Sequence, residues 1–336
     1  MTSKAQFLLL SMVLLSFTAC KEKHYFRNEG IAFGTTYHLT YNATEDLQKG
    51  IEAEMNKFNT SLSTYASTST ISRFNQYGTE PFDLGKDPWM LKMVRESLRF
   101  SELSNGAFDI TVAPLVNLWG FGPEAKSDPT QAKIDSIRTF VGYKLLKLEK
   151  EKLTKSDPRI QLDCGAIAGG YASDIIAEYL RSQGADDYMV EIGGEIVLSG
   201  KNPEGNKWRI GINKPVDDST STNNDVEKIL VLTDKSLSTS GNYRSFYVKD
   251  GKKYAHTIDP KTGYPVQHSL LSATIIANDC FTADALATAC MVVGVDSAMT
   301  LIESLPGVDA FFIYNEGGPE NKFKFTSGFQ AYLEKQ

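Results

Sequence analysis

The first half of the chain carries apolar residues three or four positions apart, which is the spacing of one helix face. Thr44 is followed by two acidic residues, and Leu47, Ile51, Met55 and Phe58 then form an apolar stripe. Threonine is a favoured N-cap, and acidic side chains are favoured in the first turn of a helix. We therefore expect a helix that begins at Thr44 and buries this stripe.

Start and stop signals predict further helices in the first half. Asp87-Pro88 offers a cap and a proline at the first helical position, and Asn105-Gly106 ends that helix. Residues 130–141 form the next helical stretch, and a run of small residues at 163–171 leads into another. Apolar residues recur every four positions from 167 onward, so this last helix should bury one face.

The second half alternates short β-rich runs with turn residues. β-branched and aromatic residues dominate these runs, as they do in strands. Helices return at 281–293 and 296–305. Because helices and strands do not alternate regularly, we expect an α+β fold with largely antiparallel sheets, in one domain over residues 30–336. The predicted strands are 34–41, 188–192, 208–212, 229–232, 243–248, 254–258, 271–277 and 309–314.

The first twenty residues are typical of a targeting segment. Lys4 precedes an apolar run that is too short to anchor stably across a bilayer, and the run ends at Cys20 behind two small residues. This arrangement resembles the lipobox of bacterial lipoproteins, whose cysteine becomes the lipidated N-terminus. We expect a signal peptide over 1–19, lipidation of Cys20 and a linker over 20–29. The alternative is an ordinary cleaved signal with an incidental cysteine.

Such a protein would be exported and held on a bacterial membrane by its lipid, facing the periplasm or another extracytoplasmic space. The formal net charge of −6 and the lack of a Lys/Arg block argue against a nucleic-acid partner. Three cysteines remain after the targeting segment, too few for a disulfide framework. Cys290 falls in an apolar helical run, whereas Cys164 and Cys280 could pair, and the sequence leaves that open.

Two segments could carry chemistry but also have ordinary structural explanations. The small residues at 163–171 would let backbone groups approach an anion, or would simply let two helices pack tightly. Asp284 and Thr288 lie four apart on one helical face, where their oxygens suit Mg²⁺. Alternatively, the aspartate favours the helix dipole and the threonine bonds a carbonyl.

Two further side chains are candidates. His256 lies in the predicted strand 254–258, which runs into an Asp-Pro-Lys-Thr-Gly-Tyr-Pro turn. Histidine titrates near neutrality and could act as an acid or a base, although a strand histidine is often structural. Asp109 follows the helix stop and could accept a hydrogen bond from a ring amine, or cap a turn.

Taken together, these segments resemble the bacterial FAD:protein FMN transferases, the ApbE family, and they occur in that family's order. Residues 106–122 match nearly throughout the tract Gly-Ala-(Phe/Met)-Asp-Ile-Thr-Val-x-Pro-Leu-Val-Asn-Leu-Trp-Gly-Phe-Gly. Residues 282–288 match Thr-Ala-Asp-Ala-Leu-Ala-Thr outright, and the turn at 163–171, the His256 segment and residues 63–75 also fit. The likeness covers about residues 30–330 and implies an ApbE-like architecture related to the T-fold.

The resemblance implies roles for individual residues. A Mg²⁺ ion would be held by the backbone carbonyl of Ala166 and by Asp284 and Thr288. The chain departs from the family at Phe33, where Met is frequent, at Gly169, where Lys or Glu is common, and at Glu191 and Glu195, where Asp is found. The change at Gly169 would remove a side-chain contact to FAD. The implied FAD contacts are Phe33, Tyr65, Ala107, Phe108, Asp109, Asp163, Gly169 and Ile258.

The implied reaction moves the FMN half of FAD onto a Thr or Ser hydroxyl of another protein and releases AMP. Such transfers depend mainly on positioning and charge neutralisation. His256 is our candidate for the base that takes the hydroxyl proton. The acceptors would be flavoprotein subunits of membrane or periplasmic redox complexes. Two alternatives stay open: hydrolysis of FAD to FMN and AMP at the same site, and a non-catalytic flavin-binding lipoprotein.

Overall fold

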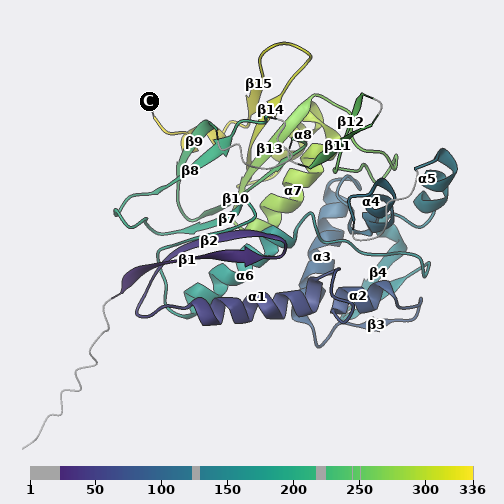
Figure 1. The fold of residues 1–336 in the computed structure, drawn as a ribbon, viewed down its shortest axis with the longest axis horizontal. Coiled ribbons are helices and arrows are strands. Elements are labelled where there is room, and N and C mark those ends of the chain that lie inside the picture. Colours follow the sequence, from purple (N-terminus) through teal and green to yellow (C-terminus); the bar gives the residue numbers. More distant parts are fainter. Residues whose placement is uncertain (1–22, 123–128, 217–224, 244, 250, 336) are drawn as a thin grey trace, which may run out of the picture.

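A computed structural model describes residues 23–122, 129–216, 225–243, 245–249 and 251–335. Its largest sheet has eight strands, each antiparallel to its neighbours, with β1 and β15 at opposite edges (Figure 1). The strand order nearly follows the chain. In sheet order the strands are β1 (His24–Ala32), β2 (Thr35–Ala43), β6 (Tyr188–Ile192), β7 (Glu195–Ser199), β10 (Lys235–Gly241), β13 (Leu270–Ala277), β14 (Asp309–Tyr314) and β15 (Lys322–Phe325).

Helices cover one face of this sheet. The helices α6 (Ala168–Ser182) and α7 (Cys280–Val293) contact its central strands, and α8 (Val295–Glu303) contacts β14. The helices α1 (Gln48–Leu62) and α3 (Pro88–Leu103) pack outside α6 and α7. A Cβ on Gly170 would come within 2.5 Å of the Cys280 carbonyl oxygen, so α6 and α7 approach this closely only because residue 170 is glycine.

The other face of the sheet carries a smaller apolar cluster. The strands β8 (Trp208–Asn213) and β9 (Val226–Leu232) pair with each other, and the short helix η3 (Phe329–Tyr332) packs beside them. Buried residues of β7, β10, β13 and β14 meet this layer. The fold is therefore layered, with the large sheet between a strand pair and the helices.

Smaller elements complete one end of the molecule. The strands β11 (Phe246–Lys249) and β12 (Lys252–Ala255) form a separate pair, which packs on α4 (Ala113–Trp119) through stacked aromatic rings. The remaining elements are α2 (Thr70–Asn75), β3 (Phe82–Asp83), η1 (Ile110–Val112), α5 (Gln131–Arg138), η2 (Tyr143–Leu145), β4 (Leu146–Glu149) and β5 (Lys152–Lys155). No helix of the described residues is both long and apolar enough to cross a membrane.

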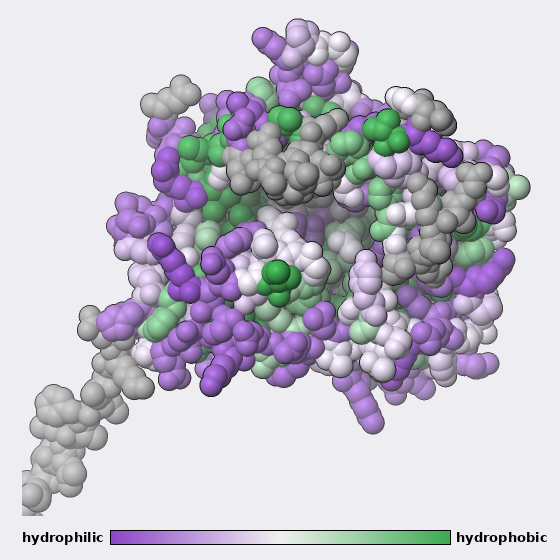
Figure 2. Space-filling view, in the orientation of Figure 1, coloured by the Kyte–Doolittle hydropathy of each residue, from purple (hydrophilic) through white to green (hydrophobic). Residues whose placement is uncertain are grey.

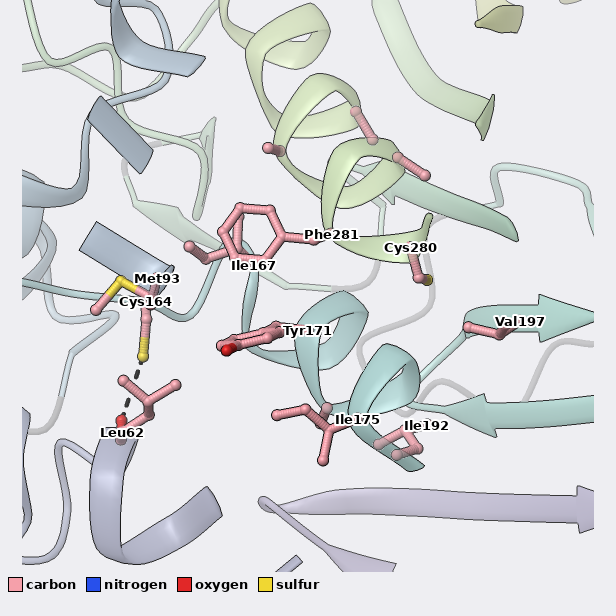
Figure 3. Close-up of a cluster of buried hydrophobic side chains, with 14 of the residues drawn as sticks. Leu62, Met93, Cys164, Ile167, Tyr171, Ile175, Ile192, Val197, Cys280 and Phe281 are labelled. Carbon is pink, nitrogen blue, oxygen red and sulfur yellow. Dashed lines mark hydrogen bonds between the residues drawn. The ribbon is translucent and has the colours of Figure 1, made fainter. Parts of the chain in front are cut away.

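The main core lies where the helices meet (Figure 3). The rings of Tyr171 and Phe281 pack edge to face with centroids 5.2 Å apart, which joins α6 to α7. The three described cysteines are free and buried, so Cys164 and Cys280 do not pair. The Cys164 thiol donates instead to the Leu62 carbonyl oxygen at 3.2 Å, and burial raises its pKa.

The α+β class and the antiparallel sheet confirm the prediction from sequence. Two expectations at the N-terminal end of the fold were wrong. The first helix begins at Gln48 rather than Thr44, because β2 runs to Ala43 and the Asp46 carboxylate then accepts from the Gln48 N–H. The sheet begins at His24, inside the expected linker 20–29, and β1 pairs with β2 over its whole length. Cys20 and the signal peptide lie outside the described residues.

Candidate functional site

Two adjoining cavities lie at one side of the helix layer. The first measures about 440 Å³ and the second about 780 Å³. Figure 2 shows this face hollowed near its middle, over the region where Figure 1 places α7 between the turn of β1 and β2 and the pair β11–β12. The cavities share a wall made of Phe121, Asp163, Gly165, Gly193 and Glu195. An extended ligand could therefore occupy both.

Every described residue that the sequence assigned to FAD, metal or catalysis lines one of the two cavities. Phe33, Tyr65 and Gly169 line the second cavity, and Asp163 lines both. What these residues bind stays a prediction, but the structure brings them together from segments far apart in the chain. The others, in the first cavity, are Ala107, Phe108, Asp109, Ala166, His256, Ile258, Asp284 and Thr288.

Three oxygens gather at the α7 side of the first cavity. Thr288 Oγ1 donates to the Ala166 carbonyl oxygen at 3.5 Å, the weak limit of a hydrogen bond, and this is the one hydrogen bond to that carbonyl within the described residues. Asp284 lies one turn before Thr288 on α7 and accepts from the Gly170 N–H at 2.9 Å and from Ser238 Oγ at 3.0 Å. Thr288 thus turns to Ala166 across the site rather than to its own helix.

Two carboxylates, the buried Asp284 and the half-buried Glu195, lie at this side of the cavity. Burial raises the pKa of Asp284 to about 7, although the hydrogen bonds from Gly170 and Ser238 oppose this. Burial and the nearby Asp284 raise the pKa of Glu195 well above its ordinary value. Among the described residues, no Lys, Arg or His side chain is bonded to either carboxylate. A carboxylate, a hydroxyl and a carbonyl are hard oxygen ligands, so the set fits a Mg²⁺ ion.

His256 lies at the opposite side of the first cavity. It follows the end of β12 rather than lying within a strand as predicted, because the chain turns at His256 towards the isolated bridge between Ile258 and Pro265. Its Nδ1 lies 3.1 Å from the Ser245 carbonyl oxygen. A carbonyl can only accept, so in the neutral ring Nδ1 carries the proton and Nε2 is free to take one.

The surroundings of His256 favour the neutral ring. Its ring is partly exposed in the cavity, yet desolvation by the enclosing protein lowers its pKa, while the Ser245 carbonyl raises it to a smaller degree. Phe121 contacts the imidazole edge to face, with centroids 6.4 Å apart. Trp119 ties the next turn in place by donating from Nε1 to the Gly263 carbonyl oxygen at 2.8 Å. A neutral imidazole held this way can act as a base near pH 7.

Asp109 caps the short helix η1, which was one of its two predicted roles. One carboxylate oxygen accepts from the N–H and the hydroxyl of Thr111, and the other from the Tyr143 N–H at 2.6 Å. Burial raises its pKa against these bonds. Asp163, in the shared wall, accepts from the Gly165 N–H, and burial raises its pKa as well. Both carboxylates shape the loops that carry the cavity walls.

The second cavity has a strained residue at its mouth. Phe33 holds φ at 55° in the turn that joins β1 to β2, a region that bulky residues rarely adopt. Its ring packs edge to face on Phe58, with centroids 5.1 Å apart. Tyr65 is 81% exposed on the same cavity, so its ring has a face free for a ligand. The rings of Phe33, Phe58, Tyr65 and Phe121 thus border this cavity.

Several lining residues were not assigned from the sequence. Glu195 stands in the shared wall, and Ser238, on β10, links Asp284 to Glu195. Thr239, Ser240 and Gly241 line the first cavity next to it. Their segment, Leu-Ser-Thr-Ser-Gly, is a run of consecutive small polar residues in a predicted gap between strands. It lacks the polar–apolar alternation that would have indicated a strand.

Comparison with known proteins places the chain in a family. The model of the ApbE family matches residues 33–312. The chain belongs to the ApbE family. A Vibrio cholerae protein named FAD:protein FMN transferase is 40% identical over 315 residues, covering 91% of this chain and 92% of the relative. The Haemophilus influenzae protein of that name is 40% identical over 305 residues, covering 86% and 87% of the two chains.

Solved structures of ApbE-family members share this fold. The flavin transferase ApbE from Vibrio cholerae superposes with a TM-score of 0.83 at 39% identity, covering 93% of this chain and all of the other. The Pseudomonas stutzeri flavinyl transferase ApbE, in its apo form, gives 0.82 at 34% identity, covering 93% and 98%. The ApbE fold therefore extends over nearly the whole chain described here.

Proposed function

We propose that this protein is a Mg²⁺-dependent FAD:protein FMN transferase that attaches FMN through a phosphoester to Thr or Ser of acceptor flavoproteins and releases AMP. The observation that carries the proposal is the pair of cavities that share one wall, with His256 and the Ala166–Asp284–Thr288 oxygens in the same cavity. FAD is two nucleotides joined by a diphosphate, so it is a ligand of this extended form. The names of the relatives support the same activity.

The metal part of the proposal rests on the oxygens of Ala166, Asp284 and Thr288. A divalent cation there would neutralise charge on the diphosphate and on the departing AMP. Ser238 and the Gly170 N–H hold the Asp284 carboxylate in one orientation. Because the carboxylate is buried without a cation of the protein, it has a strong electrostatic reason to bind one.

The chemistry left to the chain is proton transfer and positioning. The acceptor hydroxyl oxygen bonds to the FMN phosphorus, the bond from that phosphorus to the AMP oxygen breaks, and the hydroxyl proton passes to His256 Nε2. The Ser245 carbonyl keeps Nδ1 protonated and so leaves Nε2 available.

The cellular setting completes the proposal. The lipobox-like segment ending at Cys20 supports an exported protein that is anchored by lipid to a bacterial membrane. Its acceptors would be flavoprotein subunits of membrane or periplasmic redox complexes, which expose their hydroxyls on the same side. Metabolic labelling with a radioactive fatty acid would test the anchor, since a Cys20→Ala variant should lose the label.

The deciding experiment uses the chain from residue 21, FAD, Mg²⁺ and a flavoprotein acceptor domain. An FMN-sized mass gain on the acceptor together with an equal amount of AMP would support the transferase. AMP without labelling would favour FAD hydrolysis, and flavin binding without either product would favour a binding protein.

Asp284→Ala should abolish Mg²⁺-dependent release of AMP, because it removes the charged oxygen ligand. Asp279→Ala is the matched control: Asp279 caps the same helix through the Thr282 N–H, so its loss should cost about 1 kcal/mol of stability and leave turnover intact. Full activity of Asp284→Ala would contradict the metal assignment.

A further inference from the structure

Glu195 is a half-buried carboxylate of the site that the proposed chemistry does not use. It begins β7, directly after the Gly193-Gly194 turn, and lines both cavities. The one hydrogen bond that another described residue donates to its carboxylate is a 3.5 Å contact from Ser238 Oγ, which also donates to Asp284 at 3.0 Å. The carboxylate therefore has most of its accepting capacity unused, at the place where the cavities meet.

Two glycines make room for this side chain. A Cβ on Gly169 would lie against Glu195 Oε2 and 2.9 Å from its Cδ, and a Cβ on Gly193 would lie 3.0 Å from Oε2. Any side chain at either position would displace the carboxylate. Gly169 lies in the first turn of α6, where helix propensity gives no reason for a glycine. The conformation of Glu195 accounts for a glycine there.

The ligand chemistry that suits Glu195 follows from its neighbours. The proposed Mg²⁺ site on Asp284 and Thr288 is where the diphosphate would bind, so we expect a neutral part of the ligand against Glu195. In FAD the groups next to the diphosphate are the ribityl chain and the adenosine ribose, and both carry hydroxyls. A sugar hydroxyl could donate a hydrogen bond to a carboxyl oxygen of Glu195, whose contact with Ser238 is weak.

We infer that Glu195 is a specificity-determining residue that accepts a hydrogen bond from a sugar hydroxyl of the ligand. The hydroxyl belongs to a unit attached directly to the diphosphate, either the ribityl chain or the adenosine ribose. The inference rests on the proposed function for the identity of the ligand. Gly169 and Gly193 then serve to hold the carboxylate in the shared wall.

The test crosses protein variants with ligand analogues. Binding is measured by flavin fluorescence in the presence of Mg²⁺, for FAD, for FAD with a 2′-deoxyribose in its adenosine half, and for FAD with a 2′-deoxyribityl chain. The wild-type protein should bind one analogue about tenfold or more weakly than FAD. The analogue that is affected identifies which sugar donates.

Glu195→Ala should bind FAD more weakly than the wild type does, by the factor that separates FAD from the affected analogue in the wild type. The variant should no longer distinguish FAD from that analogue. Gly169→Ala should also weaken FAD binding, but should add nothing in the Glu195→Ala background, because the crowded carboxylate is gone. Glu178→Ala, on the exposed side of α6, is the control and should bind all three ligands as the wild type does. Melting temperatures show whether each variant is folded.

Other outcomes overturn the inference. The first is that Glu195→Ala binds all three ligands as the wild type does. The second is that Glu195→Ala loses affinity for all three by one factor, which would mark Glu195 as a space-filling residue. If the wild type binds FAD but releases no AMP with any acceptor, the proposed function fails while the Glu195 result stands. If the wild type does not bind FAD, both fail.

Discussion

The backbone of Phe33 is strained in a place where its ring is useful. Left-handed backbone conformations cost an ordinary residue roughly 1–2 kcal/mol, whereas Asn-Gly adopts this kind of turn readily. Phe33 precedes Gly34 in such a turn and places its ring between Phe58 and the second cavity. The strain persists because the paired strands on both sides impose the turn.

Phe33→Asn should leave the free energy of unfolding within about 1 kcal/mol of the wild type, because relief of strain offsets the loss of a half-buried ring. Binding of FAD should weaken about tenfold, because a ring that borders the cavity is gone. Chemical denaturation and flavin fluorescence measure the two effects. Phe33→Leu is the control that keeps both the strain and an apolar side chain. Unchanged FAD affinity in Phe33→Asn would show that the ring has no part in binding.

The lowered pKa of His256 predicts the pH dependence of turnover. A base is active when it is unprotonated, so AMP release at saturating FAD should fall only as the pH drops through a value below 6.5. His256→Asn should lower the rate by roughly 10²–10⁴ and remove this acid limb. His38→Asn, which alters an exposed histidine paired with Glu191, should keep both the rate and the limb. An acid limb that survives in His256→Asn would assign the titration to another group.

At the scale of elements, α7 begins against a half-buried carboxylate of α6. Asp174 Oδ1 accepts from the Cys280 N–H at 2.8 Å and Oδ2 from the Phe281 N–H at 2.9 Å. Burial nevertheless raises the pKa of Asp174 to about 6, with Asp279 adding to the rise. The helix that carries Asp284 and Thr288 is thus positioned by a group that titrates in a mildly acidic range.

The raised pKa makes stability fall with rising pH. Below the unfolded value of 3.8 the carboxyl is neutral in both states, and as the pH rises to about 6 the folded state loses up to about 3 kcal/mol relative to that reference. Asp174→Asn should remove this loss, so the difference in unfolding free energy between wild type and variant should change between pH 4 and pH 6.5 and stay constant above. Urea unfolding across this range measures it. A difference that does not vary with pH would contradict the raised pKa.

Elements with local signals were predictable, and those with tertiary causes were not. The helix α3 begins after Asp87, whose side chain accepts from the Met90 N–H, as the Asp-Pro pair predicts. The strand β1 gave no such signal, because it lies at the edge of the sheet and alternates exposed with half-buried residues rather than burying one face. The start of α1 depends on Tyr41, whose hydroxyl accepts from the Leu47 N–H and donates to Asp46.

The candidate site was likewise predictable only in part from the sequence. The resemblance located Asp284, Thr288 and His256 residue by residue, and the structure places all three in one cavity. The contact of Ser238 with Asp284 joins residues 46 positions apart, and no spacing in the sequence indicates it. The role of Glu195 depends on the space left by Gly169 on another element, which is a property of packing alone.

At the scale of the whole molecule, the edge strand β1 sets how much of the N-terminus the fold needs. All nine of its residues pair with β2, and the Tyr41 hydroxyl donates to the Asn28 side chain at 2.6 Å. A chain that starts at residue 23 should melt within a few degrees of a chain that starts at residue 21. A chain that starts at residue 33 should melt at least about 10 °C lower and aggregate, since β2 becomes an unprotected edge. Equal melting of all three chains would show that β1 is dispensable.

The pairing of β2 with β6, called the seam below, has a consequence for the order in which the chain folds. Asn42 and Asp187 meet there although 145 residues separate them, whereas β6 and β7 or β13 and β14 join neighbouring parts of the chain. Closing so long a loop is entropically costly, so this seam should form late during folding. The second cavity has the β1–β2 turn on one side of the seam and the Ile192–Glu195 turn on the other. The cavity is therefore complete only after the seam has formed. In refolding with FAD present, the rate at which flavin fluorescence is quenched should equal the rate of this late folding step.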